Sequence, residues 1–284
     1  MEKKDTNKHS LTNIAKLKEE LLVSPGEPLE LDKHDPDSKP CGLEKKEARQ
    51  ALDSMHERLN ELQEMLYAEA GRAVLIVLQA MDTGGKDGTI RKVFGPLNPQ
   101  GVQVASFKQP TPEELAHDFL WRIHREIPRK GMIRIFNRSH YEDVLIARVH
   151  KLVDKNEIQR RYEQINAFEK HLADNGVTIL KFYLHISKDE QKQRLQDRLD
   201  RPDKHWKFSS GDLAERKLWD EYMAAYAKAL QHCSTPWAPW YVIPANRKWS
   251  RDYAIGKILL DTLEAMGLNY PQPEEGLDKI TIQP

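Results

Sequence analysis

The chain has 284 residues, which is enough for one large α/β domain or for two small ones. Its 44 Lys and Arg balance 44 Asp and Glu, so net charge gives no support for non-specific binding to nucleic acid or membranes. The N-terminus is polar and no long apolar stretch occurs, which predicts a cytoplasmic protein without a membrane span. The two cysteines lie outside any CxxC pattern, so neither a disulfide framework nor a structural zinc site is expected.

The first 69 residues divide into a polar arm and a long helix. Residues 1–40 are polar and contain four prolines, so we expect an extended or weakly ordered arm and no core element. Over 44–69, apolar residues recur at three and four residues and form one helical stripe, which consists of Leu52, Met55, Leu59, Leu62 and Leu66. We expect this stripe to dock against the core, because the run is short for a coiled coil.

Strands and helices alternate through the rest of the chain. Residues 72–80 are almost continuously apolar, which is typical of a strand buried on both faces. Further strands are predicted at 102–107, 132–136, 178–185 and 240–244, and helices at 112–126, 139–152, 157–174, 188–199, 212–232 and 248–266. This order predicts a single α/β domain over 41–268, with a five-stranded parallel sheet in three α/β/α layers, and a C-terminal tail over 269–284.

Ligands of such sheets bind at the carboxyl ends of the strands, and the first strand leads there into a glycine-rich turn. In residues 81–89, MDTGGKDGT, Gly85 and Lys86 fit the P-loop pattern GxxxxGK[ST], whereas Ala80 replaces its first Gly and Asp87 its hydroxyl residue. Glycines let backbone N–H groups approach an anion, the helix N-terminus adds partial positive charge, and Lys86 adds a point charge. A flexible turn is the alternative, but it would not require a lysine. We therefore predict a P-loop kinase-like fold whose phosphate site includes Gly84, Gly85, Lys86, Asp87, Gly88, Thr89 and Arg91.

Asp82 is a carboxylate inside this predicted phosphate loop. Such a charge is unfavourable beside phosphate unless a cation lies between them, and Mg²⁺ commonly bridges one carboxylate and phosphate oxygens. Since Asp87 replaces the usual hydroxyl ligand, Asp82 is the candidate metal ligand, for Mg²⁺ or alternatively Mn²⁺. The competing interpretation is a helix cap or an ion pair with Arg91.

The third predicted strand leads into Asn137, Arg138 and Ser139. A typical Walker B strand ends in Asp, so Asn137 makes metal binding at this point doubtful. Arg138 is well placed for a bidentate phosphate contact. Ser139 is also a good helix N-cap, which is a purely structural role.

A basic stretch lies between two predicted helices. It contains Arg194, Arg198, Arg201, Lys204, His205 and Lys207, interleaved with Trp206 and Phe208. In kinases this part of a P-loop domain is a lid that closes over phosphates, so we predict a lid over about 194–211. A solvated surface face is the alternative, and the stretch alone does not decide between the two.

Five segments together resemble the polyphosphate kinase type 2 family, in the branch that accepts nucleoside monophosphates as well as diphosphates. They are 78–91, 106–124, 135–145, 201–209 and 234–249, and the resemblance covers most of 35–268. It implies that Lys86 binds the phosphates being exchanged, Asp82 holds Mg²⁺, and Arg138 contacts the transferring phosphoryl group. It also implies that Lys204, Lys207 and neighbouring lid residues such as Arg198 cover the phosphates.

The resemblance assigns further residues and an assembly. Lys108 and Arg122 would lie near the nucleotide or phosphate channel, and Glu142 would help to discriminate between acceptors. Much of the wider family has Asp where this chain has Asn137, while the most similar branch shares the Asn, which places more weight on Asp82. The family forms dimers or tetramers, so a homo-oligomer is expected.

The expected activity is transfer of a phosphoryl group from inorganic polyphosphate to AMP or ADP, reversibly. One rival is an ATP-dependent nucleotide kinase of thymidylate-kinase type, which would have the same fold. Another is a non-catalytic polyphosphate-binding protein, which would not need Asp82 together with Lys86 and Arg138. The expected partners are polyphosphate and nucleotides, and neither nucleic acid nor membrane.

Overall fold

A five-stranded parallel sheet forms the centre of the protein in a computed structural model that describes residues 17–40, 42–277 and 280–282. The strands are β1 (Ala73–Gln79), β2 (Val102–Ser106), β3 (Ile133–Asn137), β4 (Val177–His185) and β5 (Trp240–Pro244), in the spatial order β2-β3-β1-β4-β5. All neighbouring pairs are parallel. Every residue of the central strand β1 is buried, as its apolar run predicts.

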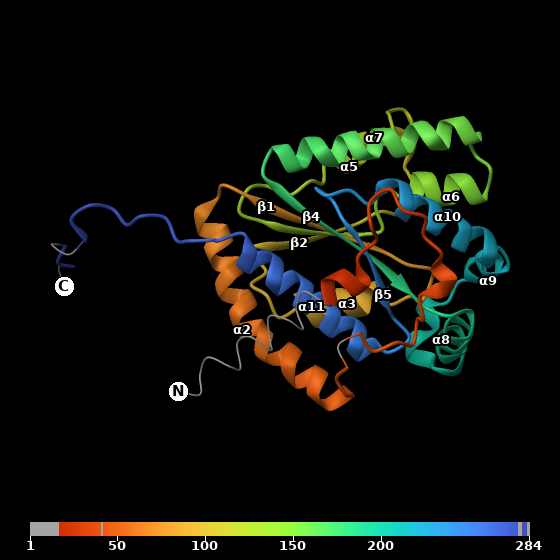
Figure 1. The fold of residues 1–284 in the computed structure, drawn as a ribbon, viewed down its shortest axis with the longest axis horizontal. Coiled ribbons are helices and arrows are strands. Elements are labelled where there is room, and N and C mark those ends of the chain that lie inside the picture. The colour runs from red at the N-terminus through yellow and green to blue at the C-terminus, as the bar shows by residue number, and fades with distance from the viewer. Residues whose placement is uncertain (1–16, 41, 278–279, 283–284) are drawn as a thin grey trace.

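Helices cover both faces of this sheet and confirm the predicted three layers (Figure 1). On one face, α2 (Lys45–Glu69) packs against α11 (Lys248–Ala265). On the other face lie α6 (Glu142–Val149), α7 (Lys155–Asp174) and α10 (Trp219–Cys233). Between β4 and α10 the chain forms α8 (Lys188–Asp200), the 3₁₀ helix η3 (Pro202–Lys207) and α9 (Ser210–Lys217), which lie at the carboxyl end of the sheet.

The apolar stripe of α2 docks against the core as predicted. Leu52, Leu59, Leu62 and Leu66 are buried, and Met55 is partly buried against the core. Facing α2, Gly256 of α11 has no side chain, and a Cβ there would lie 2.6 Å from Cδ1 of Leu52. The two helices can therefore approach each other closely at this point.

Several predicted helix boundaries are wrong. The helix expected over 112–126 is two single turns, α4 (Pro112–Leu115) and α5 (Trp121–His124), because the Asp118 side chain accepts a hydrogen bond from the Leu120 N–H at 3.0 Å and forms a turn between them. The helix expected from 139 begins at Glu142, and the one expected over 212–232 is divided into α9 and α10 at Leu218.

The expectation that residues 1–40 contribute nothing to the core is also wrong for the described part of this arm. Val23 N–H donates to the Trp240 carbonyl at 2.9 Å, and the Ser234 hydroxyl donates to the Val23 carbonyl at 2.6 Å. The arm therefore runs along β5, whose outer edge would otherwise leave backbone groups unpaired. Its buried apolar residues are Leu17, Leu21, Val23 and Leu31, the last in the 3₁₀ helix η1 (Leu31–Lys33).

After α11, residues 269–276 form no helix or strand and lead away from the domain (Figure 1). Cys41 lies outside the described residues, and Cys233 is a free, buried thiol. None of the helices in the described ranges is both long and apolar enough to cross a bilayer.

Candidate active site

The turn after β1 requires both of its glycines for steric reasons. Gly85 has φ of 107°, in the left-handed region that favours glycine. A Cβ at Gly84 would lie 2.4 Å from the Ala80 Cβ and 2.8 Å from the Met81 carbonyl oxygen. The turn is followed by α3 (Lys86–Thr89), which continues into the π-helix η2 (Ile90–Phe94). The predicted sequence of buried strand, glycine turn and helix is thus confirmed, and the glycines are needed to fold the turn itself.

Lys86 folds back over this turn. Its Nζ donates to the Ala80 carbonyl at 3.0 Å. Burial lowers the pKa of Lys86, and the neighbouring Arg138 lowers it further, while Asp82 and Glu142 oppose this shift. The lysine is therefore surrounded by the other charged residues of the predicted site.

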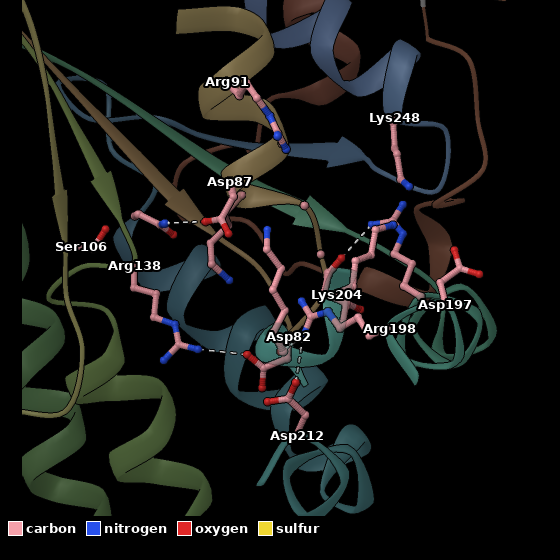
Figure 2. A pocket seen from close by; sticks show the side chains of 18 of the residues that line it. Asp82, Asp87, Arg91, Ser106, Arg138, Asp197, Arg198, Lys204, Asp212 and Lys248 are labelled. Atoms are coloured by element: carbon pink, nitrogen blue, oxygen red, sulfur yellow. Dashed lines mark hydrogen bonds and ion pairs between the residues drawn. The ribbon is translucent and has the colours of Figure 1, made fainter. Parts of the chain in front are cut away.

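Asp82 and Arg138 form an ion pair across the carboxyl end of the sheet. Arg138 Nη2 lies 3.0 Å from Asp82 Oδ1 (Figure 2). Arg138 and Thr83 both have φ of 63°, which is unusual for residues other than glycine and costs about 1–3 kcal/mol each. The alternative ion pair of Asp82 with Arg91 is wrong, because Arg138 occupies that role.

The two departures from the P-loop pattern contact each other. Asn137 Nδ2 donates to Asp87 Oδ1 at 2.9 Å. Asn137 stands where a Walker B strand would end in Asp, and Asp87 stands where the P-loop pattern has a hydroxyl residue. The usual carboxylate and hydroxyl are thus replaced by an amide and a carboxylate that are hydrogen-bonded to each other. This contact accounts for Asn137 without a metal ion.

Two buried arginines support the glycine turn: Arg194, which was expected in the lid, and Arg251, which was not predicted as a site residue. Arg194 of α8 donates to the carbonyl of Thr83 at 2.9 Å and to that of Ala245 at 2.6 Å. Arg251 of α11 is 2% exposed, and a Cβ at Gly85 would lie 1.9 Å from its Nη1. In the sequence these arginines occupy charged helical positions that are typical of a solvated face, and only the packing of α8 and α11 places them at the turn.

A cavity of about 640 Å³ joins these groups (Figure 2). Its cations are Lys86, Arg91, Lys108, Arg138, Arg194, Arg198, Lys204, Lys207, Lys248 and Arg251, and its carboxylates are Asp82, Asp87, Asp197 and Asp212. The excess of cations makes the cavity attractive to a polyanion. Among the predicted loop residues, Gly84, Gly85 and Gly88 also line it.

Three predicted site residues do not line this cavity. Thr89 is fully buried in α3. Arg122 is 6% exposed and donates to the Lys108 carbonyl at 2.9 Å, so it supports the segment that carries Lys108. Glu142 lies at the start of α6; burial raises its pKa, while Arg138 and Lys86 act in the opposite direction.

The basic stretch forms one wall of the cavity. Arg198 Nη1 lies 3.0 Å from Asp212 Oδ2 and also donates to the Lys207 carbonyl at 2.8 Å, which connects α8, η3 and α9. Lys204 and Lys207 line the cavity from η3, while Trp206 between them is 79% exposed. The alternative of a plain surface face, remote from the phosphate loop, does not describe this arrangement.

The carboxylates of the cavity provide few ligands for a metal ion. No group of three or more His, Cys, Asp or Glu in the described ranges has the arrangement of a metal-binding cluster. Asp82 lines the cavity, and one of its oxygens, Oδ1, is taken by Arg138. A single protein carboxylate suits Mg²⁺, which retains water and is completed by substrate phosphates.

The chain is similar to proteins of one family along most of its length. The family model described as polyphosphate kinase 2 matches residues 42–271. An AMP/ADP-polyphosphate phosphotransferase of Meiothermus ruber is 56% identical over 92% of this chain and 98% of that protein. An ADP-polyphosphate phosphotransferase of Rhodopseudomonas palustris is 43% identical over 92% of this chain and 94% of that protein. The crystal structure of polyphosphate kinase 2 from Arthrobacter aurescens superposes with a TM-score of 0.90, at 48% identity over 93% of this chain and 94% of that one. The chain belongs to the polyphosphate kinase 2 family.

Proposed function

We propose that this protein transfers the terminal phosphoryl group of inorganic polyphosphate to AMP and to ADP. The observation that carries the proposal is the cavity, in which ten Lys and Arg side chains face one phosphate-loop turn. A nucleotide alone presents at most a few phosphates, whereas polyphosphate presents many and needs such a lining. The names of the relatives from Meiothermus ruber and Rhodopseudomonas palustris support the same donor.

The reaction needs no general base from the protein. A phosphate oxygen of AMP or ADP, largely ionised at neutral pH, attacks the terminal phosphorus of polyphosphate, and the bridging P–O bond breaks. The leaving polyphosphate is one phosphate shorter. The attacking oxygen brings an electron pair and has no proton to lose.

What the protein supplies is position and positive charge. Phosphoryl transfer spreads negative charge over the equatorial oxygens, and preorganised cations stabilise it. Lys86, the backbone of the glycine turn and Arg138 all line the cavity, and Arg138 is paired with Asp82 of that turn. The lid lysines Lys204 and Lys207 cover the remaining phosphates.

Asp82 would hold a divalent cation, for which Mg²⁺ is the proposed identity. The cation supplies charge neutralisation between donor and acceptor phosphates. Arg138 keeps the carboxylate oriented through Oδ1. Glu142 interacts electrostatically with Arg138 and Lys86, and we propose that it favours the monophosphate acceptor.

A nucleotide assay tests the proposal. Purified protein is incubated with long-chain polyphosphate and Mg²⁺, with AMP, ADP, GMP or GDP supplied in separate reactions, and a parallel reaction offers ATP as donor to AMP. We expect ADP and ATP from AMP, and loss of turnover when the cation is chelated. Product from ADP but not from AMP would remove the role of Glu142. Turnover with ATP as donor and none with polyphosphate would replace the proposal with an ordinary nucleotide kinase.

A further inference from the structure

A fully buried ion pair lies behind the turn that carries Arg138, outside the cavity. Lys181 of β4 and Glu169 of α7 are both 0% exposed, and Lys181 Nζ lies 2.5 Å from Glu169 Oε2. Apolar residues of similar volume often give a protein equal or greater stability than a buried ion pair, because desolvation opposes the attraction. Stability alone therefore does not account for charges at these two positions.

The pair is bound to two consecutive residues of the β3–α6 turn. The Tyr141 hydroxyl donates to Glu169 Oε1 at 2.9 Å and accepts from Lys181 Nζ at 2.8 Å. His140 Nε2 lies 3.1 Å from the same Glu169 oxygen. Lys181 completes its contacts at the Cys233 carbonyl, 2.6 Å away, at the end of α10. One pair thus connects the turn to β4, α7 and α10.

Contacts within the network keep the Glu169 carboxyl in its charged form. Burial opposes the ionised form of Glu169, but Lys181 and His140 outweigh it and hold the pKa of this carboxyl below its ordinary value. An ionised carboxylate only accepts hydrogen bonds, so His140 donates through Nε2. Because each partner has a fixed direction, the network permits one arrangement of the turn and resists others.

The backbone conformation of the β3–α6 turn requires such restraint. Arg138 is in the left-handed conformation, which residues with a side chain avoid and which persists only where the surroundings fix it. From Arg138 the chain passes through Ser139, whose Oγ accepts from Gln79 Nε2 and from the Tyr141 N–H, each at 3.2 Å. Two peptide units after Ser139, the side chain of Tyr141 is fixed by the ion pair. The guanidinium is therefore separated from a rigid anchor by only a short segment of chain.

We propose that Lys181 and Glu169, through Tyr141, are positioning residues that hold Arg138 in the conformation in which its guanidinium reaches Asp82 and the transferring phosphoryl group. The inference rests on the proposed phosphotransferase function and adds to it residues that touch no substrate. A displaced guanidinium would still attract phosphate, so substrate binding would change little. The rate of the chemical step would fall, because it depends on exact alignment of charge.

Tyr141→Phe tests the link with little change of volume. It removes the hydroxyl that joins the turn to both charges. Tyr162→Phe is the matched control, since Tyr162 is buried on the same helix as Glu169 and its hydroxyl lies outside the hydrogen bonds that link Tyr141, Lys181 and Glu169. We expect Tyr141→Phe to lower kcat about fivefold with both KM values within about twofold, and Tyr162→Phe to leave kcat and KM within about twofold.

A double-mutant cycle separates positioning from a purely structural role. In an Arg138→Lys background, whose own activity is reduced, the effect of Tyr141→Phe on kcat should shrink from about fivefold to less than about twofold, because the residue to be positioned is already altered. An equal effect in both backgrounds would overturn the inference. Urea unfolding checks that each variant folds; if Tyr141→Phe does not, Glu169→Gln takes its place in the same cycle. Absence of turnover in the unaltered protein would count against the proposed function instead. The contact between Arg138 and Asp82 would then be compared in crystal structures of the unaltered protein and of Tyr141→Phe, and an unmoved guanidinium would overturn the inference.

Discussion

The cavity has two cationic walls that differ in how firmly they are held. In the wall formed by the glycine turn and its supports, Arg194 and Arg251 are 7% and 2% exposed, and Arg194 is hydrogen-bonded to several backbone carbonyls. In the lid wall, no ion pair within the described residues holds Lys204 or Lys207. The Nζ of Lys207 lies 4.8 Å from the ring centre of Trp206, which is itself largely exposed.

This difference assigns different tasks to the two walls. Charges that are already oriented stabilise a transition state without reorganisation, and they act mainly on kcat. Flexible charges attract a polyanion and are screened by salt, so they act mainly on KM.

Lys86→Met should abolish most of the activity. The charge lies in the fixed wall against the substrate phosphates, so we expect kcat to fall about 10³-fold. Lys92→Met, on the exposed face of the following η2 turn, is the control and should retain kcat. Initial rates at saturating polyphosphate measure both, and a loss smaller than about tenfold at Lys86 would remove it from the transition-state contacts.

Asp82→Asn should lower kcat about 10²-fold and raise the Mg²⁺ concentration needed for half-maximal activity. The amide keeps the shape of the side chain and an oxygen that can still accept from Arg138, but it loses the charge that attracts the cation. We expect urea unfolding to change much less than turnover. Asp189→Asn, at an exposed position in α8, serves as control. Undiminished activity with unchanged Mg²⁺ dependence would refute the metal role.

Arg194→Met should reduce stability as well as activity. It leaves the carbonyls of Thr83 and Ala245 buried without their donor, which costs about 3 kcal/mol of the free energy of unfolding. Arg201→Met removes an arginine from an exposed pair with Asp203 and should leave the urea midpoint almost unchanged. Equal urea midpoints for the two variants would mean that Arg194 does not stabilise the wall formed by the glycine turn.

Lys204→Ala and Lys207→Ala should have the smallest effects. Each removes one flexible charge of the lid, so we expect KM for polyphosphate to rise about fivefold with kcat within about twofold. The dependence of KM on salt should become shallower, since fewer phosphate contacts are broken by added ions. Lys228→Ala, exposed on α10, is the control. A fall in kcat without a change in KM would place these lysines among the fixed charges.

Local sequence was enough to predict the sheet and the phosphate loop. A continuous apolar run specifies a strand buried on both faces, and a glycine turn before a helix specifies an anion site, because both signals depend on neighbouring residues alone. All five strands lie within one or two residues of their predicted bounds. The helix over 112–126 was wrong because a side-chain turn at Asp118 interrupts an apparently helical pattern.

Other features depend on contacts between distant segments, which periodicity does not encode. The N-terminal arm joins the core because β5 offers an open edge. Arg194 and Arg251 reach the phosphate loop because the middle of α8 and the first turn of α11 pack beside it. Asn137 and Asp87 become partners across 50 positions of sequence. The order of residues specifies which side chains carry charge and where strands and turns alternate. Which of these charges become buried, paired and rigid depends on packing, because burial and pairing arise only when distant segments come together.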